Sequence, residues 1–464
     1  MAAAGAWRKP ERPRLAGMGA LWLIDVVGLV RAHLGTDTPA LSRLAGSGQV
    51  VDLDPALPAV TTTAQTTMLT GADPTRHGIV ANGWFFRDLG EVLLWRQSER
   101  LIQAPLPWSG GGLPTLKHCW WYAMHTGCTA TVTPRPVYHH DGRKSPDCYA
   151  WPPELKTAID RAHGTFPLFS FWGPGAGIAS TRWIAESFLT AVAVARPRLA
   201  LCYLPHLDYD LQRFGPTGPH LARNLRAVDA CVARIVDAAA AHGAQVAVVS
   251  EYGIAAVDHG LAINRVLRTA GWLVAVRNAA GELIDTGASR AFAMADHQCA
   301  HIYVRDPADV AAVRSLIAGM EGVAETYALG ERATVGLDHA RSGEVVAFAA
   351  PGCWFMHDWW LDEAHAPDFA RCVEIHKKPG YDPRELLFDP AGGRRRAALA
   401  LLRKALGLRY RMAVIPGDDR LVRGSHGRRP GAGDRPLLIA PAGWAVPAGA
   451  HQRDLRALID RALA

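Results

Sequence analysis

The stretch Ala20–Leu29, ALWLIDVVGL, is a continuous apolar run interrupted by one acid, Asp25. Buried parallel strands have such runs, because both faces of their sheet are covered. The pattern recurs in PRLALCYLPHLDYD, which ends in acids that include Asp208, and in AQVAVVSEYG, which ends at Glu251. Strands that end in acids predict an open α/β sheet with a functional site at its carboxyl edge.

Two helices and a closing strand extend this pattern along the chain. Residues 181–196 and 220–243 have helical periodicity, and Gly243 suits a helix C-cap. A further apolar run at residues 435–444 predicts another strand, and residues 452–464 predict a terminal helix. The alternation of strands and helices therefore covers both ends of the chain.

Two stretches interrupt this rhythm. Residues 262–411 hold their own strand and helix candidates, and residues 105–153 are irregular and rich in Trp, Tyr, His and Pro. The first stretch predicts a cap or insertion. We expect a basic N-terminal tail, the first part of the core, the cap and the last part of the core at residues 1–18, 19–261, 262–411 and 412–464.

The composition narrows the class of partner. The net charge of +7 is dispersed apart from short arginine runs, so we expect a small anionic substrate and no nucleic-acid partner. No window reaches the roughly 20 apolar residues of a membrane span, so we expect no membrane partner. The eight cysteines form no CxxC pair, which indicates reduced thiols. The basic N-terminal residues are followed by no apolar run that suits a secretory signal, so we expect a cytoplasmic protein. Nothing in the sequence indicates an oligomeric state.

The segment Leu57–Asp88, LPAVTTTAQTTMLTGADPTRHGIVANGWFFRD, carries the chemistry. It resembles the nucleotide pyrophosphatase/phosphodiesterase branch of the alkaline phosphatase superfamily. In that family P-x-x-T places the nucleophile at the start of a helix, and T-G-x-x-P-x-x-H-G-I-x-x-N follows. The matching positions are Pro58, Thr61, Thr70, Gly71, Pro74, His77, Gly78, Ile79 and Asn82.

The resemblance implies a phosphoryl-transfer site with Thr61 as nucleophile. A metal on the hydroxyl makes threonine reactive, and a helix N-terminus with Asn82 offers donors to the phosphoryl oxygens. Asp25 stands where the family has a metal ligand. Two alternatives stay open: the threonines only cap a helix, or Thr62 or Thr63 is the nucleophile.

The remaining family ligands are altered. Asp208 fits the next motif, but Gln212 stands where the family has histidine. The family's Asp-His pair becomes Glu251-Tyr252, whereas the last motif keeps His426. A literal Asp-His-Gly at residues 258–260 is a competing register, which we disfavour because no apolar strand directly precedes it.

We therefore expect two divalent metal ions held by Asp25, Thr61, Asp208, Glu251 and His426. Zinc is the metal that the resemblance implies. An oxygen-rich ligand set favours manganese or magnesium instead. Further candidates for the metals or their surroundings are Gln212, Tyr252, His206, Asp296, His297 and His376. His206 is among them because on a strand it would share a face with Asp208.

The predicted fold is α/β, an alkaline phosphatase-like, mostly parallel central sheet flanked by helices, with an inserted cap. The predicted function is hydrolysis of a small phosphodiester, phosphoanhydride or phosphonate through a phosphothreonine at Thr61. A phosphotransferase and a non-catalytic member of the same fold with an altered metal site are the alternatives. The aromatic residues Trp120, Trp121 and Tyr122 either line the substrate pocket or pack in the core.

Overall fold

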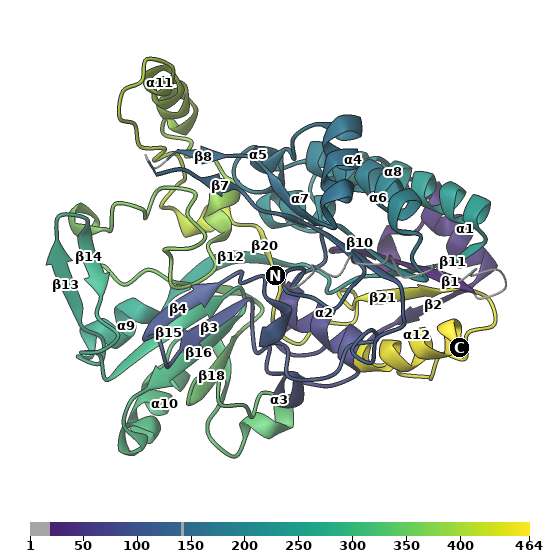
Figure 1. Ribbon diagram of the computed structural model, residues 1–464. Coiled ribbons are helices and arrows are strands. Elements are labelled where there is room, and N and C mark those ends of the chain that lie inside the picture. The colour runs from purple at the N-terminus through teal and green to yellow at the C-terminus, as the bar shows by residue number, and fades with distance from the viewer. Residues whose placement is uncertain (1–18, 141–142) are drawn as a thin grey trace, which may run out of the picture.

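The computed structural model describes residues 19–140 and 143–464, so the expected basic tail lies outside the described residues. A central eight-stranded sheet has the order β2-β21-β11-β1-β10-β5-β6-β9 (Figure 1). Its middle strand, β1 (Ala20–Val26), runs parallel to both neighbours, β10 (Leu199–Leu204) and β11 (Ala244–Val249). The carboxyl ends of these three strands therefore meet at one edge, where Asp25 and Glu251 lie.

The sheet is mostly parallel, which confirms the predicted fold class. β11 pairs antiparallel with β21, β21 with β2, and β6 with β9, whereas β10, β5 and β6 pair in parallel. The bounds of these outer strands are β2 (Gln49–Asp52), β5 (Thr115–His118), β6 (Ala130–Pro134), β9 (Cys148–Trp151) and β21 (Leu437–Ala440).

Helices cover both faces of the central sheet (Figure 1). Side chains of β1 alternate between these faces: Trp22 and Ile24 pack into one buried cluster, and Leu21 and Leu23 into another. The first cluster includes residues of α1 (Pro39–Ser47), α4 (Pro153–His163), α6 (Ile178–Ala195) and α8 (Leu221–His242). The second includes residues of α2 (Thr61–Thr70) and α12 (Leu455–Leu463).

A second, antiparallel sheet has the order β15-β16-β18-β17 and its own buried cluster. Its strands are β15 (Ala291–Asp296), β16 (Cys299–Val304), β17 (Val323–Tyr327) and β18 (Val345–Ala349). The helices α9 (Ile263–Thr269) and α10 (Val310–Ala318) contact it. This sheet falls inside the stretch that we expect to be the cap, while the exact division of the chain stays a prediction.

Smaller elements complete the fold. β12 (Ala255–Ala262) pairs with β19 (Gly352–Met356) and with β20 (Gly424–Ser425). Three separate antiparallel pairs are β3 (Gly83–Phe86) with β4 (Glu91–Leu94), β7 (Val137–Tyr138) with β8 (Lys144–Ser145), and β13 (Ala275–Asn278) with β14 (Gly281–Ile284), each a two-stranded sheet of the described residues. The other α-helices are α3 (Pro74–His77), α5 (Leu168–Phe171), α7 (His206–Phe214) and α11 (Gly393–Ala405).

Two local expectations were wrong. Residues 105–153 are not merely irregular, because they supply β5, β6 and β9 to the central sheet. These strands have only four or five residues each, too few for a clear periodic signal. The strand that begins at Leu199 ends at Leu204, and Pro205 is the N-cap of helix α7, which begins at His206.

Buried neutral histidines predict a specific sensitivity to acid. Burial lowers the pKa of His118 to about 3, whereas the unfolded chain titrates near pH 6.5. Below pH 6.5 the unfolded state therefore binds the extra proton, and this contribution to stability is lost as the pH falls. At pH 5 the loss is about 2 kcal/mol.

We expect His118→Gln to remove this loss. Buried carboxyls with raised pKa values stabilise the folded protein as the pH falls, which masks the effect of His118 in the wild type alone. The test therefore compares the unfolding free energies of wild type and variant at each pH. The difference in unfolding free energy between wild type and variant should shrink by about 2 kcal/mol from pH 7.5 to pH 5, measured by urea titration. A pH-independent difference would show that His118 is not buried in the neutral form.

Candidate functional site

Thr61 is the first residue of α2, and its hydroxyl faces the loop that follows β11. Its Oγ1 lies 3.2 Å from the Tyr252 hydroxyl and also contacts the Glu251 carboxyl. The hydroxyls of Thr62 and Thr63 instead donate to backbone carbonyl oxygens, at 2.9 and 3.1 Å. Of the three adjacent threonines, Thr61 is therefore the one whose hydroxyl lies among ionisable side chains.

The N-terminus of α2 provides N–H donors beside Thr61. The first hydrogen bond within the helix is donated by Ala64, so the three preceding N–H groups have no partner inside the helix. Asn82 Oδ1 accepts from the N–H of Thr62 at 3.1 Å. The N–H groups of Thr61 and Thr63 are then the donors that this helix end offers to an anion.

Two buried carboxyl groups face each other beside Thr61. The side-chain Nε2 of Gln65 donates to both, 3.2 Å from Asp25 Oδ2 and 2.6 Å from Glu251 Oε1. Burial raises the pKa of Asp25 to about 7, and burial with the nearby Asp25 charge holds the pKa of Glu251 well above its usual range. Among the described residues, no hydrogen-bond donor reaches Asp25 Oδ1 or Glu251 Oε2.

Gln65 is a site residue that the sequence analysis missed. Its Oε1 accepts from the backbone N–H of Trp121 at 2.8 Å, which turns its NH₂ group toward the carboxyls. The sequence does contain a pattern that could have identified Gln65. It lies four residues after Thr61, so the two side chains share a face of α2. By holding one oxygen of each carboxyl, Gln65 leaves the other oxygen of each without a donor.

Replacing Gln65 with methionine is expected to weaken metal binding by about 10- to 100-fold, the usual cost of removing a group that orients metal ligands. Methionine has a similar shape but donates no hydrogen bond. Titration calorimetry with Mn²⁺ measures the effect. Gln245→Met, at an exposed position at the other end of β11, is the matched control and should bind as wild type does. Equal affinity of both variants would rule out an orienting role for Gln65.

A chain of hydrogen bonds joins Thr61 to Asp208. The Tyr252 hydroxyl donates to Asp208 Oδ1 at 3.3 Å, so in its contact with Tyr252 the Thr61 hydroxyl is the donor. Gln212, four residues on along α7, donates to Asp208 Oδ2 at 2.7 Å and accepts from the Tyr381 hydroxyl at 2.9 Å. Gln212 and Tyr252 therefore contact an acid of the site directly.

Four aromatic rings stack beside these groups. His426 lies between Tyr252 and His297, with ring centroids 3.5 and 3.8 Å away, and His297 stacks on Tyr381 at 3.6 Å. The Nδ1 of His426 donates to a backbone carbonyl at 2.7 Å. Its Nε2 lies 4.0 Å from Asp208 Oδ1 and has no hydrogen-bond partner among the described residues.

Asp296 connects the second sheet to the nucleophile helix. It accepts from both the backbone N–H and the Nδ2 of Asn82, at 2.8 and 3.1 Å, and lies 2.7 Å from the Nδ1 of His297. His297 has a φ of +60° at the turn after β15, an uncommon conformation for a non-glycine residue. Burial holds the pKa of His297 and of His426 well below the usual range, so both rings are neutral and keep a lone pair on Nε2.

Comparison with known proteins identifies this arrangement. Residues 22–382 match the type I phosphodiesterase / nucleotide pyrophosphatase family. The chain belongs to this family. Its members are phosphodiesterase and nucleotide pyrophosphatase enzymes, and the family typically depends on divalent metal ions. A search of curated protein sequences gave no match.

Solved structures of two relatives share the fold. An inactive variant of murine ectonucleotide pyrophosphatase / phosphodiesterase 5, in complex with AMP, is 14% identical, with 96% of this chain and 95% of that chain covered and a TM-score of 0.57. Phosphonoacetate hydrolase from Sinorhizobium meliloti, in complex with phosphonoacetate, is 13% identical, with 96% of each chain covered and a TM-score of 0.58. At sequence identities this low, these structural similarities establish the fold of the chain and not its substrate.

One cation position suits the metal that the type I phosphodiesterase / nucleotide pyrophosphatase family implies. Asp25 Oδ1 and Glu251 Oε2 are buried without a donor among the described residues, and the Thr61 hydroxyl contacts the Glu251 carboxyl. Buried carboxyls without a counter-charge are costly, so this all-oxygen set fits a hard divalent cation.

The second family position fits a cation less well. Both oxygens of Asp208 already accept hydrogen bonds, from Gln212 and from Tyr252. Within the part of the chain that the structure describes, no three His, Cys, Asp or Glu ligand atoms of this site lie within 4.8 Å of one another. The replacements at Gln212 and Tyr252 thus remove the convergent donors that two imidazoles would supply.

Two of the additional candidates are not brought to the site. His206 opens α7 two residues before Asp208, and residues two apart on a helix point in different directions, so the expected shared face was wrong. His376 is exposed and contacts the ring of Tyr138. The alternative Asp-His-Gly motif at residues 258–260 does not belong to this site. Its Asp258 and His259 are exposed in β12, whereas Glu251 is buried.

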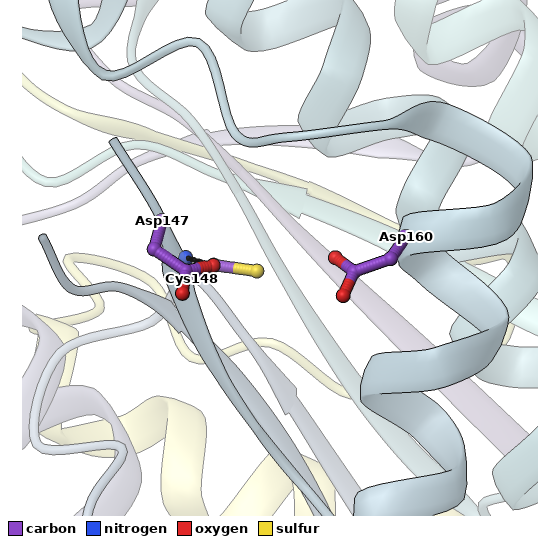
Figure 2. A group of neighbouring side chains, drawn as sticks. All are labelled: Asp147, Cys148 and Asp160. Carbon is purple, nitrogen blue, oxygen red and sulfur yellow. Dashed lines mark hydrogen bonds between the residues drawn. The ribbon is translucent and has the colours of Figure 1, made fainter. Parts of the chain in front are cut away.

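A separate acidic group lies away from Thr61. Asp147 and Cys148 face Asp160 of α4 across a short gap (Figure 2). The Lys156 ammonium already bridges the two carboxylates, 3.1 Å from Asp147 and 2.6 Å from Asp160. The Lys156 ammonium therefore supplies the positive charge that balances these carboxylates, and we assign no metal ion to this group.

Four aromatic residues, Trp95, Trp121, Trp172 and Tyr381, form a contiguous group near Gln65, which we call the aromatic wall. Trp95 stacks on Trp121 with centroids 4.8 Å apart, and Tyr381 contacts both Trp95 and Trp172, at 6.2 and 5.5 Å. The three tryptophans are half-buried, so parts of their faces remain open. By contrast, Trp120 and Tyr122 are core residues, 1% and 2% exposed.

Proposed function

We propose that this chain hydrolyses a small phosphodiester, phosphoanhydride or phosphonate by transferring the phosphoryl group to Thr61. The observation that carries the proposal is the setting of the Thr61 hydroxyl. It lies at a helix N-terminus, contacts the buried Glu251 carboxyl, and is joined to buried Asp208 through the Tyr252 hydroxyl. The hydroxyls of Thr62 and Thr63 instead donate to the backbone. A residue that only capped a helix would need none of these acids.

The hydrogen-bond chain gives the proton a route. As Thr61 Oγ1 forms its bond to phosphorus and the leaving group departs, the hydroxyl proton passes to Tyr252, whose own proton passes to Asp208 Oδ1. The N–H groups of the α2 N-terminus and the second Nδ2 hydrogen of Asn82 hold the phosphoryl oxygens. Water then attacks the phosphothreonine and restores Thr61.

Asp25 and Glu251 would hold a divalent cation beside Thr61. Asp208 and His426 do not fit a second one, because Gln212 and Tyr252 already donate to both oxygens of Asp208. When bound, the cation beside Thr61 stabilises the developing negative charge on the attacking and phosphoryl oxygens. The all-oxygen donors around Asp25 favour manganese or magnesium over zinc, although zinc is the metal that the family resemblance implies.

The aromatic wall favours a substrate with a flat apolar group. Half-buried tryptophans next to the nucleophile stack on planar rings at little entropic cost. Structural relatives bind AMP, which carries a base, and phosphonoacetate, which does not. We place the leaving group of this chain's substrate against Trp95 and Trp121, and we propose no nucleic-acid partner.

We also propose a cytoplasmic location. All eight cysteines lie in the described ranges and none forms a disulfide, although six of them are buried where a bond would be protected. Reduced thiols are the rule in the cytosol and the exception outside it.

A non-catalytic member of the fold is the second candidate. The observation in its favour is that Gln212 and Tyr252 donate hydrogen bonds to Asp208, where two imidazoles would otherwise bind metal. Such a protein would bind a phosphate ester without turnover. A phosphotransferase differs only in passing the phosphoryl group to an alcohol.

The test is hydrolysis of bis-p-nitrophenyl phosphate and of p-nitrophenyl phosphate by protein stripped of metal and resupplied with Zn²⁺, Mn²⁺ or Mg²⁺. Turnover that depends on added metal is the expected result, with Mn²⁺ or Mg²⁺ at least as effective as Zn²⁺. Product release that rises with added glycerol would reveal transfer to an alcohol. No turnover with any metal, by a folded protein that binds metal, would favour the non-catalytic candidate.

A further inference from the structure

Helix α11 stands out from the body of the molecule, in the upper left of Figure 1. With the turn that follows it, residues 393–411 read GRRRAALALLRKALGLRYR, with seven basic and no acidic residues. Six of the sixteen exposed large apolar side chains of the described residues fall in this short segment. They are Leu399, Leu401, Leu402, Leu406, Leu408 and Tyr410, each 40% to 65% exposed. We call residues 393–411 the basic amphipathic segment.

Three of the five exposed leucines form a stripe, while Leu401 lies on another side of the helix and Leu408 follows it. Leu399, Leu402 and Leu406 are spaced i, i+3 and i+7, which places them on one face of the helix. The opposite face rests on the molecule through buried Gly393 and Ala400. The apolar stripe therefore points away from the protein and finds no cover within the chain.

Most basic side chains of the basic amphipathic segment have no acidic partner among the described residues. Among the described residues, the ion pairs of this segment include one, between Arg396 and Asp389. Arg396 also donates to the Ala413 carbonyl at 2.9 Å, and Arg394 packs over the Phe388 ring at 5.1 Å. These contacts fix the base of the helix, and Arg403 donates to the Arg409 carbonyl at 2.9 Å. Apart from the pair of Arg396 with Asp389, no basic side chain of the segment has an acidic partner within the part of the chain that the structure describes.

We propose that the basic amphipathic segment binds the surface of a bilayer that contains anionic lipid. Leucines on one face inserted at the headgroup boundary, with arginines and a lysine around them, are the pattern of a helix that lies in a membrane interface. A second copy of this chain does not fit, because two such segments would bring seven positive charges each into contact. A nucleic acid would leave the leucine stripe exposed.

The segment lies on a membrane and does not cross one. No helix of the described residues is long and apolar enough to span a bilayer, and α11 has 13 residues. The binding therefore goes beyond the proposed hydrolysis and departs from the expectation of no membrane partner. That expectation rested on the absence of a span, and a span is a different feature from an interfacial helix.

Co-sedimentation with vesicles tests the proposal. Wild-type protein should bind vesicles of mixed phosphatidylcholine and phosphatidylserine, and bind pure phosphatidylcholine vesicles far less. Arg395→Gln, Arg403→Gln and Lys404→Gln together should weaken binding roughly 100-fold, because each basic residue near an anionic surface contributes about a factor of five. Leu399→Ser, Leu402→Ser and Leu406→Ser together should weaken it by at least about ten-fold with all charges kept.

The matched control is the triple variant Leu89→Ser, Leu329→Ser and Leu361→Ser, whose leucines are 63%, 56% and 58% exposed on other elements. It should bind as wild type does. Unchanged hydrolysis of a soluble ester by all variants would show that they are folded. The proposal is overturned if wild type ignores anionic vesicles, if neither α11 variant loses binding, or if α11 instead mediates dimerisation or binds RNA in light-scattering and filter-binding assays.

Discussion

Thr61→Ala is expected to lower kcat for phosphodiester hydrolysis by at least about a thousand-fold while the protein stays folded. The substitution removes the atom that forms the bond to phosphorus, and losses of a nucleophile are among the largest known in enzymes. The Michaelis constant should change much less, because the helix N-terminus and Asn82 still bind the phosphoryl group. Initial rates at saturating metal and substrate measure both quantities.

Thr63→Ala is the matched control for this result. It removes the same hydroxyl two residues along α2, where that group donates to a backbone carbonyl at 3.1 Å. We expect a small loss of stability and nearly full activity. A large loss of kcat in Thr63→Ala with little effect in Thr61→Ala would identify Thr63 as the nucleophile instead.

Asp25→Asn is expected to abolish the stabilisation of the protein by Mn²⁺ and to reduce kcat by at least about a hundred-fold. A ligand that binds only the folded state adds about 2.7 kcal/mol at a concentration of about 100 times its Kd. Asparagine keeps the shape of Asp25 but offers a neutral oxygen, so most of this gain should disappear. Thermal unfolding with and without added Mn²⁺ measures it.

Asp229→Asn is the control for Asp25→Asn. It shows how much stability the protein loses when a buried aspartate outside the metal position is replaced. Asp229 is as deeply buried but accepts from the N–H groups of Ala40 and Leu41, far along the chain from the cation position. This variant should be less stable yet keep the Mn²⁺-dependent increase in unfolding temperature. If Asp25→Asn kept the increase as well, the metal would bind elsewhere.

The strands and the main ligands could be predicted from the sequence because local pattern determines them. The apolar run around Asp25 and the run before Glu251 are long enough to read as buried strands, and parallel pairing then places their ends together. Short strands such as β5 gave no such signal, and they were found only through their pairing with β10.

Other parts of the site depend on tertiary contacts. Gln65 and Tyr381 are not among the positions that define the family motif, and their roles follow from the partners that the fold brings to them. The direction of His206 depends on where the strand ends and α7 begins, which is the least predictable feature of any element. The aromatic wall likewise joins Trp95, Trp121, Trp172 and Tyr381 from four separate segments.

Acid-quenched mass spectrometry of the enzyme during turnover of bis-p-nitrophenyl phosphate tests the central claim most directly. Peptides from the quenched protein should carry one added phosphoryl ester group on Thr61, and the Thr61→Ala protein should carry none. Rapid turnover without modification of any threonine of α2, or with the group on another side chain, would contradict the account.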